Sequence, residues 1–222
     1  MSIMTVLPLT PDELLTTTRS VRKRLDLNRP VPLELIRECL DLALQAPSGS
    51  NSQGWHWLVI TDPETKSAIG DLYRRSTEKY LEIRSQQMEA PGAPAADSDA
   101  GKAIRRIRDS SAYLGQHMGD VPVQVIACIE VAGEWKAGAS QTGLWGSLLP
   151  AAWSYMLAAR SRELGTAWTT LHLAYEQEAA EILGLPSHVR QGVLIPTAYY
   201  TGETFRPARR APLDAVLHVN GW

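Results

Sequence analysis

The run from Val121 to Glu130 (VPVQVIACIE) constrains the fold most, because it is apolar almost without interruption. A strand with one solvated face alternates apolar and polar residues, whereas a strand covered on both faces need not. The run therefore predicts the central strand of a sheet. Ser147 to Leu164 is apolar almost all round in its first half, with Gly165 in a C-cap position, and this predicts a buried helix.

Local signals predict the other elements. Thr10-Pro11-Asp12-Glu13 is typical of a helix start, with Thr as the N-cap and Pro at the first helical position. Val131 to Gly146 is expected to form a loop. The expected helices are Thr10 to Thr18, Leu33 to Gln45, Glu64 to Gln87, Lys102 to Met118 and Tyr175 to Leu183, and the expected further strands are Trp57 to Thr61 and Gln191 to Thr197.

These elements favour an α+β fold in a single domain, residues 1–222, with helices dominating. Residues from about 88 to 101 are rich in Ala, Pro, Gly and Asp, so we expect a mobile loop there. Residues from about 198 to 222 show little periodicity but contain Tyr199, Tyr200, Phe205 and Trp222. Such a tail is too apolar for a free arm, and it should pack on a partner subunit or on its own domain.

The composition and charge of the chain exclude several classes of protein. The net charge of −2 is unlike that of an electrostatic nucleic-acid binder. Residues 1–9 lack the pattern of a signal peptide, and the most apolar helix is too short to span a bilayer and contains Pro150. Cys39 and Cys128 lie in apolar segments without CxxC spacing, so we expect reduced, buried thiols in a cytoplasmic protein with no membrane partner.

Several catalytic motifs are absent. The chain has no phosphate-binding glycine loop, no G-x-S-x-G and no paired spacing among its five histidines that would indicate a metal site. If the chain is an enzyme, a bound organic cofactor is expected to supply the chemistry.

The stretch Gln45 to Thr61 (QAPSGSNSQGWHWLVIT) places backbone N–H groups, hydroxyls and carboxamides between two apolar segments. Such groups can make directional hydrogen bonds to a polar heteroaromatic ligand while Trp55 and Trp57 exclude water. Alone, the stretch is more typical of a simple turn between a helix and a strand.

Four segments, taken in order, resemble the FMN-dependent nitroreductase family. They are Thr18-Arg-Ser-Val-Arg22, Ala46-Pro-Ser-Gly-Ser-Asn-Ser-Gln53, Gly165-Thr-Ala-Trp-Thr-Thr-Leu171 and Arg206-Pro-Ala-Arg-Arg-Ala-Pro212. The resemblance runs from about Glu13 to Trp222. It implies a central, mostly antiparallel sheet surrounded by helices, in an intertwined homodimer with an extended C-terminal tail. The chain departs from the family pattern at Thr18, where many relatives have a basic residue, and at Gly54, where proline is common.

The resemblance also implies a flavin site. The residues on the phosphate and ribityl side are Arg19, Ser20, Arg22, Arg209 and Arg210, and those along the ring are Pro47, Ser48, Gly49, Asn51 and Gln53. Trp168, Thr169, Thr170 and Leu171 complete it, with the backbone N–H groups of Thr170 and Leu171 near flavin N5 and O4. Trp168 is either a cavity wall or core, Lys23 and Arg24 are read as a solvated turn, and Gln116 or His117 is a candidate for a further contact.

The implied activity is ping-pong transfer of hydride from NADPH or NADH through flavin N5 to nitroaromatic or quinone acceptors, with no catalytic side chain and no metal. Two FMN sites would lie at the homodimer interface. The alternatives are a non-catalytic flavin-binding or storage protein, or a same-fold enzyme of the dehalogenase, flavin-destructase or enoyl reductase type.

Overall fold

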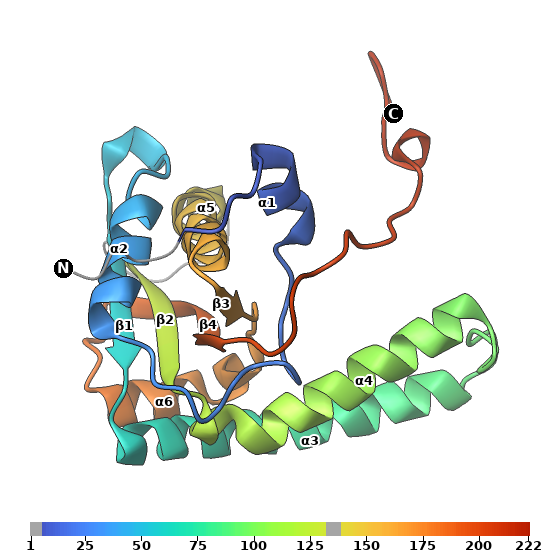
Figure 1. Cartoon of the computed structure of the whole chain (residues 1–222), viewed down its shortest axis with the longest axis horizontal. Helices are drawn as coiled ribbons and strands as arrows, with labels where there is room; N and C mark the ends of the chain where they lie inside the picture. Colours follow the sequence, from blue (N-terminus) through green and yellow to red (C-terminus); the bar gives the residue numbers. More distant parts are fainter. Residues whose placement is uncertain (1–5, 132–138) are drawn as a thin grey trace.

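The computed structural model describes residues 6–131 and 139–222, with only the backbone for residues 139 and 140. The strands in these ranges form one antiparallel sheet in the order β1-β2-β4-β3 (Figure 1). The predicted α+β class and the mostly antiparallel central sheet are confirmed. The strands are β1 (Trp55–Ile60), β2 (Val123–Glu130), β3 (Leu164–Thr166) and β4 (Val189–Tyr199).

Strand β2 is central and buried on both faces, as its composition predicts. Val125, Ala127 and Ile129 belong to one core cluster, whereas Ile126 and Cys128 belong to a second. This alternation follows from the two-residue period of a strand. Each face of the sheet therefore has its own hydrophobic core.

Helices cover both faces. Residues of α2 and α5 contribute to the first core cluster, and residues of α3, α4 and α6 contribute to the second. Thr10 caps α1 through a capping box with Glu13, which confirms that predicted start. The helices are α1 (Pro11–Thr17), α2 (Leu33–Ala43), α3 (Pro63–Glu89), α4 (Asp99–His117), α5 (Ala139–Ser161) and α6 (Glu176–Leu183), with short 3-10 turns η1 (Gly49–Asn51), η2 (Met118–Asp120), η3 (Leu171–Tyr175) and η4 (Leu213–Ala215).

The bounds predicted for the buried helix are wrong at both ends. Residues 139–146 of the expected loop belong to α5, and residues 132–138 of that loop lie outside the described ranges. At the other end α5 stops at Ser161, and Glu163, with φ of 61°, turns the chain into β3. Gly165 is therefore a strand residue, not a C-cap. A Cβ there would lie 3.1 Å from Val21 Cγ1, so glycine allows the close approach of a neighbouring segment.

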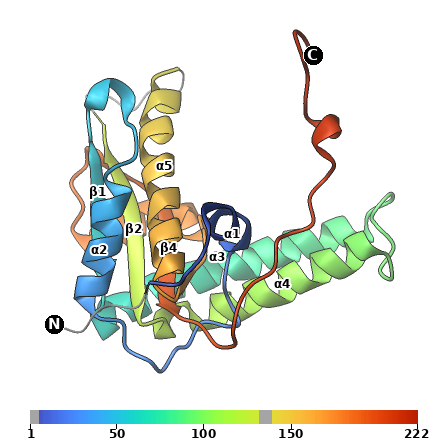
Figure 2. The same ribbon diagram turned by 45° about the horizontal axis from the view of Figure 1, so that its top comes forward.

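The expected loop at 88–101 is shorter than predicted, because α3 continues to Glu89 and α4 begins at Asp99. The turn folds back on α4: Ser98 Oγ accepts from the Gly101 N–H, and Arg105 donates to the Ala96 carbonyl. The two helices form a long hairpin that extends past the sheet (Figure 2).

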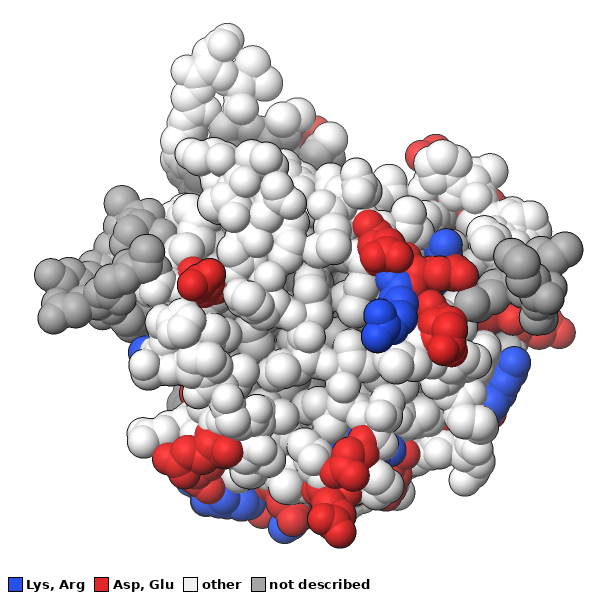
Figure 3. Space-filling view, turned by 90° about the vertical axis from the view of Figure 1, so that its left-hand side faces the viewer, with Lys and Arg blue, Asp and Glu red and all other residues white. Residues whose placement is uncertain are grey.

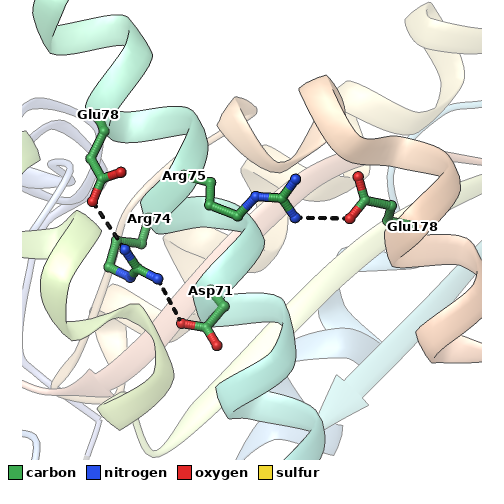
Figure 4. A network of polar contacts seen from close by, with 5 residues as sticks. All are labelled: Asp71, Arg74, Arg75, Glu78 and Glu178. Carbon is green, nitrogen blue, oxygen red and sulfur yellow. Dashed lines mark hydrogen bonds and ion pairs between the residues drawn. The ribbon is translucent and has the colours of Figure 1, made fainter.

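Ion pairs fix the start of α6 against α3. Arg75 donates to Glu178 at 2.8 Å, while Arg74 bridges Asp71 and Glu78 along α3 itself (Figure 4). The Arg75 guanidinium also lies 4.0 Å from the centre of the Tyr175 ring at the end of η3. These contacts hold η3 and the residues that precede it in a fixed position against α3.

The C-terminal tail leaves the body of the molecule (Figures 1 and 2). Ala198 and Tyr199 belong to β4, so the tail starts later than the predicted residue 198. Beyond it, apolar side chains are strongly exposed: Leu213 is 67% exposed, Val219 is 74% exposed, and Trp222 is fully exposed. The tail thus does not pack on its own domain over these residues.

Candidate functional site

The segment Arg19 to Arg22 lies beside β3. Ser20 and Thr166 form a parallel bridge, and the Val21 N–H donates to the Thr166 carbonyl at 2.7 Å. Val21 is buried, whereas Ser20 is exposed and Arg19 and Arg22 are half-exposed. One buried valine and one backbone hydrogen bond therefore present a hydroxyl and two guanidinium groups to solvent on the same short segment.

Two arginines hold the root of the tail. Arg24 Nε donates to the Thr201 carbonyl at 2.6 Å, and its guanidinium lies 4.3 Å from the Phe205 ring centre. On the other side Arg160 donates to the Tyr200 hydroxyl at 2.8 Å and lies 5.1 Å from the same Phe205 ring. Aromatic faces attract cations, so these rings help to stabilise the buried charge of Arg160. The predicted solvated turn is therefore wrong for Arg24.

A basic cleft opens between these segments and α4. Its inner lobe, about 570 Å³, and its outer lobe, about 960 Å³, share Arg19, Ser110, Arg206 and Pro207. Asp99 is the sole carboxylate among the described lining residues. The basic residues that line the inner lobe are Arg19, Arg22, Lys23, Arg24 and Arg206. Those that line the outer lobe are Arg19, Lys102, Arg106, Arg206, Arg209 and Arg210. Such an excess of one sign attracts anions.

The segment Trp168 to Leu171 follows β3, the strand that Ser20 bridges at Thr166. Thr169 is tied to β4 by hydrogen bonds with the Leu194 backbone in both directions, and its hydroxyl donates to the Leu194 carbonyl at 2.7 Å. Trp168 is half-buried and packs against the first core cluster, and a role as a cavity wall stays a prediction. Thr170 is the N-cap of η3 and makes no side-chain cap. The first N–H groups of a helix have no partner within it, so this end of η3 offers free donors.

Tyr73 connects this segment with Arg22. Burial raises the pKa of the Tyr73 phenol to about 12, while the nearby charge of Arg22 and a hydrogen bond with Thr169 oppose that rise. Arg22 and Thr169 thus both face Tyr73. The structure therefore brings together two of the predicted segments, 19–22 and 168–171.

The loop of residues 47–53, which is predicted to bind the flavin ring, is built differently from the basic cleft. Ser50, Asn51 and Gln53 all have positive φ, between 49° and 54°, a region that non-glycine residues rarely adopt. The Gly49 N–H donates to Ser147 Oγ of α5 at 2.9 Å, and Gln53 Nε2 donates to Asn51 Oδ1 at 3.1 Å. Pro47 is exposed and Ser48 half-exposed. The loop therefore presents amides and hydroxyls to solvent in a strained backbone.

This loop and the basic cleft lie near different parts of α5. The loop contacts α5 at Ser147, whereas the tail root contacts it at Arg160. Thirteen residues of helix separate these two contacts by roughly 20 Å. Within one chain the structure therefore does not bring residues 47–53 together with Arg19 and Arg22.

The tail arginines lie in the outer lobe. Arg209 donates to Asp99 at 3.0 Å, and Arg210 donates to the Arg209 carbonyl at 3.4 Å. His117 pairs with Asp120 at 2.9 Å and contacts the Tyr113 ring at a tilt of 40°, and neither His117 nor Gln116 lines a lobe of the cleft. The residues of α4 that do line it were missed: Lys102, Arg106 and Ser110, which recur every four residues and so share one helix face.

His172 is a further buried group beside this segment. It is fully buried, and neither ring nitrogen has a hydrogen-bond partner among the described residues. Burial lowers the pKa of its imidazole to about 4, so the ring is neutral at pH 7. Across residues 6–131 and 139–222, no group of three His, Cys, Asp or Glu side chains could hold a metal ion, and no helix is long and apolar enough to cross a membrane.

Comparison with known proteins identifies the family. A sequence model described as "Nitroreductase family" matches residues 15–199. An NADH dehydrogenase of Thermus thermophilus is 30% identical over 215 residues, covering 90% of this chain and 90% of the relative. Human iodotyrosine deiodinase 1 is 26% identical over 208 residues, covering 92% of this chain but only 66% of that protein. This chain thus spans about two thirds of the length of the deiodinase.

Solved structures share the fold. A crystal structure of oxidised iodotyrosine deiodinase bound to FMN and 3-iodo-L-tyrosine superposes with a TM-score of 0.70 at 19% sequence identity, covering 95% of this chain and 99% of the other. At this identity the likeness concerns the fold alone. It confirms the nitroreductase-like architecture expected from the sequence.

Proposed function

The chain belongs to the nitroreductase family, and we propose that it is an FMN-dependent oxidoreductase that uses NADPH or NADH to reduce nitroaromatic or quinone acceptors. The observation that carries the proposal is the inner lobe of the basic cleft, where Arg19, Ser20 and Arg22 lie together beside β3. Arginine forks and a hydroxyl suit a dianionic phosphate monoester.

The donor set fits FMN. Arg19, Ser20 and Arg22 would hold its phosphate, aided by Arg209 and Arg210 from the tail, and Trp168 to Leu171 would lie beside its ring. When bound, FMN supplies an N5 atom that accepts a hydride from the nicotinamide and donates it to the second substrate. The free N–H groups at the start of η3 would orient and stabilise a negatively charged ring edge.

Side chains of this chain are not required as nucleophiles. Burial raises the pKa of both cysteine thiols, Cys39 and Cys128, to about 12, so neither is a thiolate at pH 7. His172 is neutral and enclosed. The chain would then act by positioning the nucleotide and the acceptor in turn over the flavin ring. Because both substrates would use one pocket, ping-pong kinetics are expected.

A homodimer would complete the site. Residues 47–53 lie roughly 20 Å along α5 from the cleft, so the loop of a second copy is needed to cover a ring whose phosphate is at Arg19. Few charged side chains cover the centre of the face beside α2 and the free edge of β1 (Figure 3), and the exposed apolar tail needs a surface to cover. We propose that the tail wraps the partner subunit.

Initial-rate kinetics test the proposed function. FMN-loaded protein is assayed with NADPH or NADH against 4-nitrobenzoate and a benzoquinone, with both substrates varied. Parallel double-reciprocal lines with either acceptor are expected. A protein that retains FMN but oxidises neither nucleotide would be a flavin-binding or storage protein, and the oxidoreductase proposal would then be wrong.

A second candidate is reductive dehalogenation, favoured by the likeness to human iodotyrosine deiodinase 1 over 92% of this chain. It is tested by supplying 3-iodo-L-tyrosine to the reduced protein and measuring iodide. Release of iodide faster than reduction of 4-nitrobenzoate would favour the deiodinase assignment, and absence of iodide release would remove it.

A further inference from the structure

The outer lobe of the cleft carries more positive charge than a flavin phosphate requires. Lys102 and Arg106 of α4 line this lobe, and neither is among the residues expected to bind FMN. Both side chains are exposed, and within the described ranges neither pairs with a carboxylate. The lobe's carboxylate, Asp99, is already paired with Arg209 at 3.0 Å.

These two cations face the lobe from a rigid element. Lys102 and Arg106 are four residues apart, and Ser110 follows after four more, so all three lie on one face of α4. Helix α4 is packed closely on the turn before it and on α3: a Cβ at Gly101 would lie 3.0 Å from Ala96 Cα, and one at Gly115 would lie 2.6 Å from Thr77 Cγ2. The cations are therefore presented by a fixed helix and not by a loop, which is what a specific site requires.

The outer lobe also adjoins the inner lobe. The two share Arg19 and Arg206 in their walls, and Arg19 donates to the Arg206 carbonyl at 2.8 Å, which places the root of the tail between them. At about 960 Å³ the outer lobe is large enough for a nucleotide-sized group. Its occupant would lie next to the phosphate end of the flavin and open to solvent.

We propose that Lys102 and Arg106 bind the 2′-phosphate of NADPH, and so make this enzyme prefer NADPH to NADH. The inference rests on the proposed function. A phosphate monoester is doubly charged and has three oxygens to accept hydrogen bonds, so it uses one arginine fork and one ammonium group together. NADH carries two hydroxyls on the same ribose and gains little from these cations.

Direct binding tests the site without turnover. Isothermal titration calorimetry of the FMN-loaded protein compares adenosine 2′,5′-bisphosphate with adenosine 5′-monophosphate, which lacks the 2′-phosphate. Lys102→Ala and Arg106→Ala are each expected to weaken binding of the bisphosphate about tenfold, as for loss of one charge-assisted hydrogen bond. Binding of the monophosphate should not change. Arg108→Ala is the matched control, because Arg108 pairs with Asp109 and lies about 200° around the helix from Arg106.

Kinetics and flavin content complete the test. In both variants kcat/KM for NADPH should fall about tenfold while that for NADH is kept, since only NADPH presents the extra dianion. Equal affinity of the wild-type protein for the two adenosine nucleotides would overturn the inference. So would loss of FMN from Lys102→Ala and Arg106→Ala, which would assign these cations to the flavin phosphate. Either result leaves the oxidoreductase proposal standing, whereas a protein that binds no FMN would remove both that proposal and the inference that rests on it.

Discussion

The two halves of the predicted site, a basic end that contacts α5 near Arg160 and a loop end that contacts it at Ser147, are built differently. At the Arg160 end, regular backbone hydrogen bonds such as Val21 to Thr166 hold arginines at fixed places. At the Ser147 end, an exposed loop without charged residues holds amides and hydroxyls in a left-handed backbone. A phosphate can be recognised by charge on a regular frame, whereas the polar edge of a ring needs directed donors, and strain of this kind is typical of ligand-binding loops.

The separation of the two ends predicts that the site combines two chains, and complementation tests this. Arg19→Ala disables the basic end, and Ser48→Trp blocks the loop end. When assayed without added FMN, each variant should be nearly inactive alone. After co-expression with different tags, the mixed dimers should recover about a quarter of wild-type activity, because half of the dimers are mixed and each has one intact site. A mixture as inactive as its components would place both halves of the site in one chain.

Loss of a single arginine at the basic end should have the next largest effect. Arg19→Ala removes a charge-assisted contact with the FMN phosphate and should weaken FMN binding about 10- to 100-fold. Flavin fluorescence titration measures the dissociation constant, and Arg37→Ala on the exposed side of α2 is the control. Wild-type flavin occupancy of Arg19→Ala after gel filtration would refute the role of this segment.

Acid should lower the free energy of unfolding through the protonation of His172. The pKa of His172 in the folded protein is lowered to about 4, below its unfolded value of 6.5, so the unfolded chain binds this proton first. Stability should therefore be constant above about pH 7 and fall as the pH decreases from 6.5 towards 4. The contribution of this group between pH 7 and pH 5 is about 2 kcal/mol.

Urea unfolding at both pH values measures this contribution. His172→Leu should lose less unfolding free energy between pH 7 and pH 5 than the wild type, whatever its stability at pH 7. An identical pH dependence in the two proteins would show that His172 does not titrate in this way.

The smallest effect is expected at the loop end. Ser147→Ala removes the acceptor of the Gly49 N–H and should cost about 1 kcal/mol, which lowers Tm by roughly 2–4 °C. Hydrogen exchange should accelerate at residues 48–53 and not at residues 19–22. Ser161→Ala, at the C-terminal end of the same helix, is the matched control because its hydroxyl bonds only to the nearby Ala158 and Arg162 among the described residues. Equal acceleration at both segments would mean that the two ends are mechanically coupled.

The sequence predicted those features that depend on local chemistry. The capping box at Thr10 and Glu13 was visible in four residues, and the burial of β2 was visible in its composition. Gly165 shows where this approach fails. A glycine after an apolar helix is typical of a C-cap, but Val21 and Leu25 of a distant segment decide its role.

The same limit applies to the site. Arg19, Ser20 and Arg22 could be assigned through a short motif, whereas Lys102, Arg106 and Ser110 belong to no motif and lie in a segment that was predicted only to be a helix. A charged helix face is usually solvated. In the structure, Arg19 and the tail lie beside this face of α4, so that the face forms one wall of a cleft.

The most direct test of the account is an anaerobic titration of the purified protein with NADPH, followed by its visible spectrum. An FMN-dependent oxidoreductase should be a yellow protein that bleaches on addition of NADPH and regains its colour on addition of a nitroaromatic acceptor. A colourless protein that also fails to take up added FMN would contradict it.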